Sequence, residues 1–307
     1  MKKERIQRQR LIGSRRETIE GLCFVLPGLI YMLAMIGYPI LYNIVLSFQD
    51  VSVFNIKAGQ DRPFIGVENY RLIFANDTML PALSNTFLYT IVCLIVQFVF
   101  GLLLALLYNK NFALAKPLRG FLVVSWMMPV TVTALLYKYM LSPDVGIIDY
   151  ILMNIGIIDQ PVGWLLNQKT AIWGPIIANS WVGIPFDMLL LSAGLAAVPQ
   201  DVYESAAIDG ANVWQKFTRI TLPLLRPAIM SVLVLGFVNT FKVFDLIFVM
   251  TGGGPVNAPE VLSTFAYKQS FGYYYFGQGA AIANVLMAIL FVVAFIYLIL
   301  IKKGDEM

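Results

Sequence analysis

Six long, mostly apolar stretches recur along this chain of 307 residues and constrain its fold more than any other feature. A bilayer core about 30 Å thick is crossed by roughly 20 apolar residues in a helix, so each stretch is long enough to span it. Helices are expected because backbone groups that face lipid must be hydrogen-bonded within their own segment, and the alternation typical of barrel strands is absent from the sequence. The sequence therefore predicts an all-α membrane protein with six transmembrane helices in a lipid bilayer. The expected spans are 21–48, 86–108, 118–137, 170–195, 227–250 and 279–301.

The overall composition agrees with this class. Hydrophobic residues make up 59% of the chain and charged residues only 13%, whereas soluble domains carry about 25% charged residues. Cys23 and Cys93 lie inside apolar stretches, where packing is favoured over a disulfide or a metal site. The sequence has no histidine, which excludes imidazole catalysis and the usual metal ligation. We expect neither an enzyme nor a nucleic-acid partner.

The positive charges are distributed unevenly between the loops. Fifteen of the 22 lysines and arginines lie in the N-terminal segment, in the loops after the second and fourth stretches, and at the C-terminal end, whereas the longer opposite loops hold six. Because cytoplasmic loops are enriched in these residues, both termini and the loop after the fourth stretch are expected in the cytoplasm. Residues 1–20 are expected to form a basic cytoplasmic arm, because the apolar run that follows is too long for a cleaved signal peptide. Residues 21–303 form the predicted membrane domain.

A polar loop over residues 201–223 separates the fourth and fifth stretches. Its first part is rich in helix formers, with Asp201 as the expected N-cap; Gly210 permits a change of direction, and a second amphipathic helix is expected to end at Pro223. Two short helices joined by a glycine would form a compact knob with Glu204 exposed. The knob is expected either to transmit motion from a cytoplasmic partner or to lie on lipid headgroups as an interfacial helix.

The last predicted outer loop, residues 251–278, begins with a chain reversal and contains a run of aromatic residues. The reversal follows from Gly252, Gly253 and Gly254, since glycine adopts positive φ without steric cost. The aromatic run, 271–276, is expected either to anchor at the headgroup level or to contact a partner protein.

Three charged residues, Asp187, Lys242 and Asp245, fall well inside the predicted spans, away from their ends. Charged groups near the bilayer centre cost roughly 2.5–3.5 kcal/mol each, so they should face protein or water. Lys242 and Asp245 are three positions apart, which on one helix favours an ion pair, and Asp187 is a further expected partner for Lys242. Direct contact of Lys242 or Asp245 with a substrate is the alternative.

Two stripes of small and polar residues occur at helical spacing on the fourth and fifth spans. Amide groups hydrogen-bond sugar hydroxyls, aromatic rings cover sugar C–H faces, and glycines leave volume, so these stripes favour a sugar-binding site. Close packing of helices through small residues, with asparagine as interhelical glue, is the alternative. The first stripe consists of Asn179, Val182, Gly183 and Phe186, and the second of Gly236, Asn239, Thr240 and Val243.

The polar loop resembles the "EAA" loop of bacterial ABC importer permeases in its order and spacing, although Ser205 stands at the motif's second letter, where the family has alanine. Three weaker motifs occur in the family's order: F-x-G-x-x-N-Y at Phe64–Tyr70, W-x-G-x-P at Trp181–Pro185 and T-x-G-G-P at Thr251–Pro255. Over residues 20–303 the chain thus resembles MalF-type permeases of the carbohydrate-uptake class of ABC importers, the binding-protein-dependent transport permeases.

This resemblance implies a type I ABC importer permease fold in the bacterial cell membrane, assembled as a heterodimer with a second, MalG-like permease. A cytoplasmic ABC ATPase dimer and an extracellular solute-binding protein are the other implied partners. In the family, sugar contacts lie near W-x-G-x-P and T-x-G-G-P, which implies that both polar stripes bind substrate. The family's polar loop sits in a cleft of the ATPase, which implies a coupling role for Glu204, Ala206, Ala207, Asp209 and Gly210.

The expected function is ATP-driven import of a sugar, with an oligosaccharide as the expected cargo. No G-x-x-x-x-G-K-[ST] phosphate loop occurs in the sequence, so ATP and Mg are expected on the partner ATPase and no cofactor on this chain. An ion-coupled secondary transporter of a small polar solute is the alternative, although paired broken helices in two similar halves are not evident. An intramembrane enzyme is a weaker alternative, because the sequence lacks an evident catalytic cluster.

Overall fold

The structure is a computed structural model that describes residues 20–305 except 56, 58–60, 111 and 255–258. Most of the predicted basic arm therefore lies outside the described residues. Within the described part, β-structure is limited to two isolated bridges, Gln49–Phe64 and Ser52–Tyr275, so the predicted all-α class is confirmed. By length and composition, four helices could cross a membrane, or up to six if each of two bent helix pairs forms one span.

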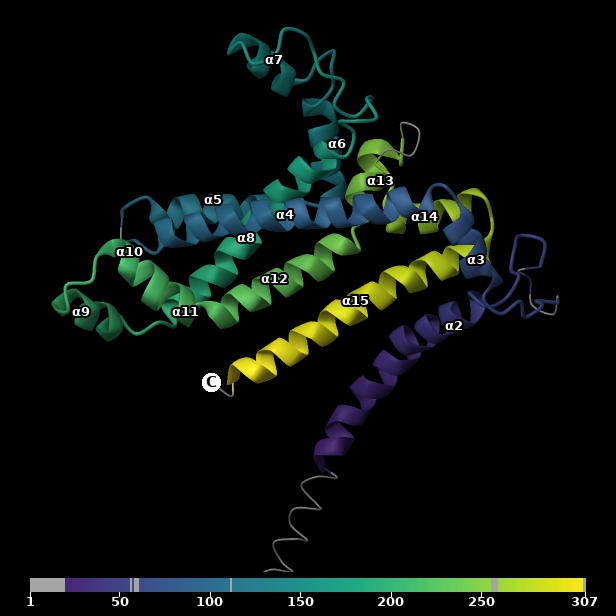
Figure 1. Cartoon of the computed structure of the whole chain (residues 1–307), viewed down its shortest axis with the longest axis horizontal. Helices are drawn as coiled ribbons and strands as arrows, with labels where there is room; N and C mark the ends of the chain where they lie inside the picture. Colours follow the sequence, from purple (N-terminus) through teal and green to yellow (C-terminus); the bar gives the residue numbers. More distant parts are fainter. Residues whose placement is uncertain (1–19, 56, 58–60, 111, 255–258, 306–307) are drawn as a thin grey trace, which may run out of the picture.

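The helices run between two ends of an elongated bundle (Figure 1). At its centre α4 (Met79–Tyr108) and α8 (Trp173–Ala196) pack along much of their length, and α12 (Arg226–Phe241) packs against both. Helices α9, α10 and α11 gather at one end, and α3 and α14 lie at the other. These end elements are α9 (Gln200–Ile208), α10 (Val213–Lys216), η2 (Phe217–Thr221) and α11 (Leu222–Leu224), opposite α3 (Glu68–Ala75), α14 (Leu262–Tyr267) and η3 (Lys268–Gly272).

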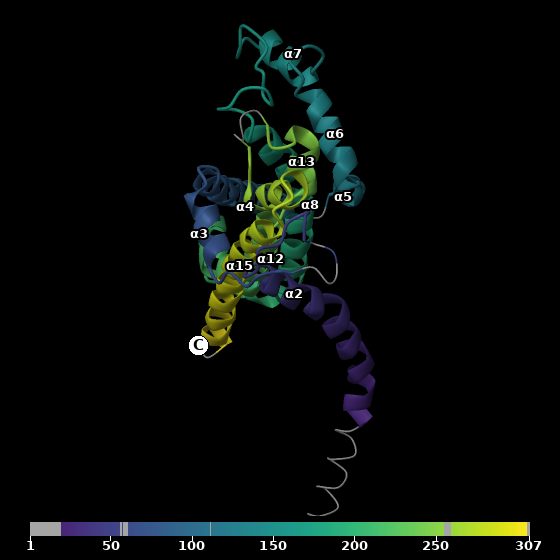
Figure 2. The ribbon, with the colours of Figure 1, turned by 90° about the vertical axis from the view of Figure 1, so that its right-hand side faces the viewer.

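The first long helix, Glu20–Leu46, extends away from the bundle in both views (Figures 1 and 2). It includes a π-helical turn, η1 (Leu33–Gly37), and then α2 (Tyr38–Leu46). None of its most apolar window is buried within the chain, which fits a helix covered by lipid or by another subunit. At its inner end Asn43 Nδ2 donates to Asn284 Oδ1 of α15 (Phe276–Asp305) across 2.7 Å, so α2 is tied to the last helix.

The predicted third span, 118–137, is two helices rather than one. Helix α5 (Ala115–Met127) and helix α6 (Val130–Met140) meet at an angle of 97°. The bend falls at Pro129, which cannot donate a backbone hydrogen bond and forces the residue before it away from helical angles. Met128 accordingly has an extended ψ of 136°. Helix α6 leads to α7 (Ile147–Asn154), which stands off the bundle (Figure 2).

The predicted fifth span, 227–250, is also interrupted. Helix α12 ends at Phe241, and a separate helix, α13 (Asp245–Thr251), begins three residues beyond its C-cap, Lys242. The expected ion pair between Lys242 and Asp245 is therefore wrong: they lie on different elements, both are exposed, and within the described residues they form no salt bridge. The three-residue spacing would have brought them together only on one continuous helix.

The F-x-G-x-x-N-Y segment holds the end of the first helix in place. Asn69 is buried, and its Nδ2 donates to the backbone oxygens of Ser47 and Gln49, each across 2.9 Å. The Tyr70 hydroxyl lies 2.9 Å from the Ser47 hydroxyl and accepts from Asn284 at 3.2 Å. These bonds join α2, α3 and α15, so the motif has a structural role at this end of the bundle.

Candidate functional site

A cavity of about 260 Å³ lies between α4, α5, α8 and α12, in the middle of the bundle. Two polar stripes that are distant in sequence meet in its wall, as predicted from their helical spacing. The stripe residues that line the cavity are Asn179, Val182, Gly183, Phe186, Gly236, Asn239 and Thr240. The eighth predicted residue, Val243, lies elsewhere: it packs against two hydrophobic clusters, because α12 ends at Phe241 and the chain turns away.

A hydrogen bond between helices defines one wall of this cavity. Gln97, on α4, is 4% exposed, and its Nε2 donates to the backbone oxygen of Asn179 across 3.0 Å. Gly183 lies so close to the Gln97 amide that an added Cβ would overlap it. Glycine at this position therefore lets α4 and α8 approach while the Asn179 side chain lines the space beside them.

Aromatic rings form another part of the wall. Trp126, near the end of α5, lies 5.7 Å from Phe186 of α8 between ring centroids, with the two planes inclined by 32°. Trp126 lies just before the Pro129 bend, so the bend fixes where α5 ends beside the cavity. The cavity thus combines two rings with the amides of Asn179 and Asn239. Such a combination binds hydroxyl-rich ligands, because rings cover C–H faces while amides both donate and accept hydrogen bonds.

Asp187 also lines the cavity, although it was predicted to pair with Lys242. It is 1% exposed, and its Oδ2 has no hydrogen-bond partner among the described groups. A Cβ on Gly101 of α4 would lie only 2.7 Å from the Asp187 Cβ, so the carboxyl sits where the two helices are in close contact. A buried carboxyl oxygen without a partner is energetically costly, and this makes it available to a polar group that enters the cavity.

Sequence reasoning missed Gln97 and Trp126 as cavity residues. Gln97 could have been found, because it is a polar residue in the middle of a strongly apolar stretch. Trp126 gave no comparable signal, since it reaches the cavity only because α5 stops at the bend before Pro129.

Beyond the C-terminal end of α8, the polar loop folds into the predicted knob of two short helices. Helix α9 is followed by Gly210 with φ +76°, a left-handed conformation that glycine adopts without strain. Helix α10 begins after a capping box in which Asn212 and Gln215 bond each other's backbone N–H groups. The Tyr203 hydroxyl lies 3.0 Å from that of Thr221, which joins the two halves of the knob.

The boundaries of the knob differ in detail from the prediction. Helix α9 begins at Gln200 after Pro199, so Asp201 lies in the first turn rather than at the N-cap, where its charge favours the helix dipole. The second half continues through η2 and α11 to Leu224, just past Pro223, and meets α12 at 64°.

The knob presents both polar and apolar groups to its surroundings. Glu204 is exposed, and among the described residues it accepts only from Gln200, one turn earlier in α9, across 2.9 Å. Ile208, Val213 and Trp214 are also exposed, so a large apolar surface lies around the Gly210 turn. Of the other predicted coupling residues, Ala207 and Asp209 are exposed, and Ala206 is half-buried. An exposed apolar surface of this kind is typical of a contact with another protein.

Comparisons with known sequences give a family and several transport permeases that this chain resembles. Residues 97–303 match the family described as "Binding-protein-dependent transport system inner membrane component". The trehalose/maltose transport system permease protein MalF of Thermococcus litoralis is 31% identical over 283 residues, which cover 92% of this chain and 94% of that protein. The sulfoquinovosyl glycerol transport system permease protein SmoG of Agrobacterium fabrum is 29% identical over 279 residues, which cover 91% and 89% of the two chains.

Solved structures share the fold. A chain of a bacterial ABC transporter involved in the import of the acidic polysaccharide alginate superposes with a TM-score of 0.76 at 24% identity, covering 97% of this chain and 99% of that one. A chain of the MetNI methionine ABC transporter in an inward-facing conformation has a TM-score of 0.54 at 15% identity, covering 75% and 99%. The arrangement of helices is therefore that of ABC importer permeases.

Proposed function

Because the chain belongs to the family of binding-protein-dependent transport system inner membrane components, we propose that it is the subunit of an ATP-driven importer that carries a sugar into the cell. Members of this family are multi-pass cell membrane proteins that act as transporter permeases rather than as enzymes. The observation that carries the proposal is the cavity between α4, α8 and α12, where amides and aromatic rings converge.

A hydroxyl-rich cargo fits the groups in this cavity. Asn179, Asn239 and Thr240 offer donors and acceptors, and Phe186 with Trp126 offers ring faces. The trehalose/maltose and sulfoquinovosyl glycerol permeases are named for cargoes that contain a sugar. We infer an oligosaccharide, bound one unit at a time, because the cavity of about 260 Å³ lies just below the roughly 300–1,000 Å³ of sites that hold a whole drug-sized ligand.

The knob formed by α9 and α10 is the proposed contact with the ATPase subunit that hydrolyses ATP. We place the knob in the cytoplasm, since lysines and arginines concentrate on that side of the predicted spans. Glu204 would pair there with a basic group of an ATPase, while Ile208 and Trp214 would bury their apolar surface against it. Helix α8 connects the knob directly with the cavity, so movement of the ATPase would reorient the helices around the cargo.

We assign the second permease and the solute-binding protein to two further surfaces of this chain. The exposed apolar helix Glu20–Leu46 would lie against a second, MalG-like permease and the surrounding lipid. An extracellular solute-binding protein would deliver the cargo at the end formed by α3 and α14. ATP and Mg would bind to the ATPase dimer.

Uptake into proteoliposomes tests this function. The complete complex is reconstituted with its binding protein outside and ATP inside, and accumulation of a radiolabelled sugar is measured. We expect accumulation that requires enclosed ATP and persists when ionophores collapse the ion gradients. Accumulation that follows an imposed proton or sodium gradient without ATP would instead identify an ion-coupled secondary transporter.

A further inference from the structure

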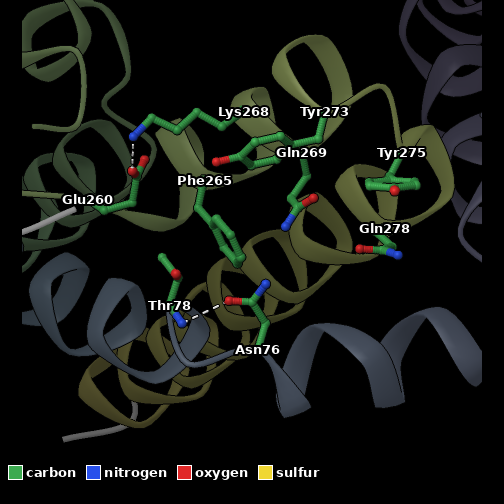
Figure 3. A pocket seen from close by; sticks show the side chains of 9 residues that line it. All are labelled: Asn76, Thr78, Glu260, Phe265, Lys268, Gln269, Tyr273, Tyr275 and Gln278. Carbon is green, nitrogen blue, oxygen red and sulfur yellow. Dashed lines mark hydrogen bonds and ion pairs between the residues drawn. The ribbon is translucent and has the colours of Figure 1, made fainter. Parts of the chain in front are cut away.

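The end of the bundle that carries α3 and α14 (Figure 1) also holds a second cavity, of about 280 Å³, whose lining side chains are drawn in Figure 3. Its walls come from the turn after α3, from α14 with η3, and from the start of α15. It lies at the opposite end from the knob of α9 and α10, and is therefore extracellular in the proposed orientation. Neither the predicted substrate stripes nor the knob contributes to it.

Three side-chain amides converge on this cavity, and two of them are without hydrogen bonds. Figure 3 shows the amides of Asn76 and Gln269 pointing into it from opposite walls, with Gln278 beside them. Asn76 Oδ1 accepts from the Thr78 backbone across 2.9 Å. The Gln269 and Gln278 amides form no hydrogen bond with any described group, although Gln269 is buried. Amides in such positions are donors and acceptors ready for a ligand.

An ion pair between a buried carboxylate and a half-buried lysine makes the cavity polar without a net charge. Glu260 is 0% exposed and forms a salt bridge with Lys268, while its Oε1 lacks a partner in the described part of the chain. Asn85 of α4 donates to the Glu260 backbone oxygen across 3.0 Å, which holds the main chain at Glu260 against α4. Because the two charges compensate each other, the cavity has no net charge to attract an ion, and a neutral ligand can donate a hydroxyl to Oε1.

Two tyrosine rings border the cavity and remain largely exposed. Tyr273 and Tyr275 are 60% and 51% exposed, and the run to which they belong was predicted to anchor in headgroups or to meet a protein. Between them Tyr274 has φ +62°, a strained conformation for a residue with a Cβ. Tyr275 is also held by a backbone bridge to Ser52. The strained turn thus places both rings at the cavity, where they can cover an apolar ligand face.

We propose that this cavity is an outer binding site for one neutral sugar unit, occupied before the cargo reaches the cavity between α4, α8 and α12. Free amides, an unpartnered carboxylate oxygen and exposed rings are the groups that hold a sugar ring by its hydroxyls and its C–H face. The inference rests on the proposed function, because only an importer of sugars gives an outer site of this kind a role.

Saturation-transfer NMR on the complete importer in nanodiscs, without the binding protein, tests the site. The probes are maltose, trehalose and cellobiose, with sodium glucuronate as a charged comparison. We expect transfer from the protein to the ring protons of at least one neutral disaccharide, and little transfer to glucuronate. Loss of one hydrogen bond in Gln278→Ala should weaken the signal about fivefold. Gln168→Ala, which removes an exposed glutamine outside the cavity, should leave it unchanged.

Two further variants distinguish the outer site from the central one. Tyr273→Leu, at an exposed ring, should reduce the signal with the folded complex intact. Asn239→Ala, which removes a sugar contact of the central cavity, should leave a signal that falls further when Gln278→Ala is added. Absence of transfer from every neutral sugar, or a signal that follows Asn239 instead of Gln278, would overturn the outer site.

The same preparations separate this inference from the proposed function. ATP-driven uptake without an NMR signal would refute the outer site and leave the importer standing. If Gln278→Ala weakens docking of the binding protein while no sugar binds, the cavity belongs to that protein and the inference is wrong. If wild-type importer shows no ATP-dependent uptake, the proposed function itself fails, whatever the NMR result.

Discussion

The side-chain nitrogen of Gln97 donates to the backbone oxygen of Asn179 across 3.0 Å, and Gly183 leaves the space that the Gln97 amide occupies. This contact joins α4 to α8 in the wall of the central cavity. Because α8 also leads to the knob, the contact links the proposed sugar site with the element that the ATPase would move. We therefore expect that one methyl group added at position 183 would disturb this contact.

Gly183→Ala is expected to lower coupled uptake about tenfold, a loss of about 1.4 kcal/mol. The added methyl group displaces the Gln97 amide and breaks its hydrogen bond. In the double variant with Gln97→Ala the overlap disappears, so uptake should be no lower than in Gln97→Ala alone. Gly163→Ala is the control, since its nearest neighbour would be Leu166 Cβ at 3.5 Å. If the loss of uptake in the double variant equalled the sum of the losses in the two single variants, the two residues would not be coupled.

Asn239→Ala is expected to abolish sugar uptake while the complex still assembles. Asn239 is exposed and lines the cavity, so its loss removes a ligand contact and leaves the helix packing unchanged. Uptake, co-purification of the ATPase and basal ATP hydrolysis are measured side by side. Asn109→Ala, which removes an exposed asparagine at the end of α4, is the matched control. Normal uptake by Asn239→Ala would exclude this stripe from the sugar site.

Glu204→Ala is expected to uncouple the ATPase. Glu204 is exposed, and its one hydrogen bond to a described residue is to Gln200 within α9, so the unfolding free energy should change by no more than about 0.5 kcal/mol. Binding-protein-stimulated ATP hydrolysis and uptake should fall together. Asp159→Ala, which removes an exposed carboxylate beyond α7, away from both the knob and the end formed by α3 and α14, is the control. Full stimulation in the Glu204 variant would argue against a coupling role for this carboxylate.

Gly253→Ala is expected to destabilise the outer end of the bundle, whereas Gly254→Ala is expected to be tolerated. Gly253 has φ +77°, and an added Cβ would overlap the Glu260–Lys268 pair, while at Gly254 it would meet only the Thr251 oxygen at 3.5 Å. The left-handed conformation alone costs an alanine about 1–2 kcal/mol. Thermal unfolding of the detergent-solubilised chain measures the difference. Equal melting temperatures for the two variants would contradict this explanation of the glycine motif.

Much of the fold could be predicted because the bilayer limits the choices. Apolar length alone located the first, second, fourth and sixth spans close to Glu20–Leu46, α4, α8 and α15. The helix breaks were harder to predict, since a proline within a span can be tolerated or can produce a bend. Pro185 lies inside α8, whereas Pro129 separates α5 from α6 at 97°. Packing against neighbouring helices decides between these outcomes, and the residues around each proline do not reveal that packing.

The candidate site was predictable to the extent that it follows helical periodicity. Asn179, Gly183 and Asn239 were found because residues on one face of a helix share a neighbour. Val243 lies outside the cavity, and the Lys242–Asp245 pair does not form, for one reason: the predicted periodicity continues past Phe241, where α12 ends. The outer cavity was not predicted, because Asn76 and Gln278 meet only through packing of α3 against α15.

The most direct test is the accessibility of Asn239→Cys, in a chain with Cys23→Ser, to a membrane-impermeant thiol reagent. The buried Cys93 should not react. In oriented proteoliposomes containing the full complex, we expect labelling from the cytoplasmic face without nucleotide. With ATP, vanadate and the loaded binding protein, labelling should shift to the extracellular face. Labelling whose side is unaffected by ATP would contradict a sugar pathway through this cavity driven from α9 and α10.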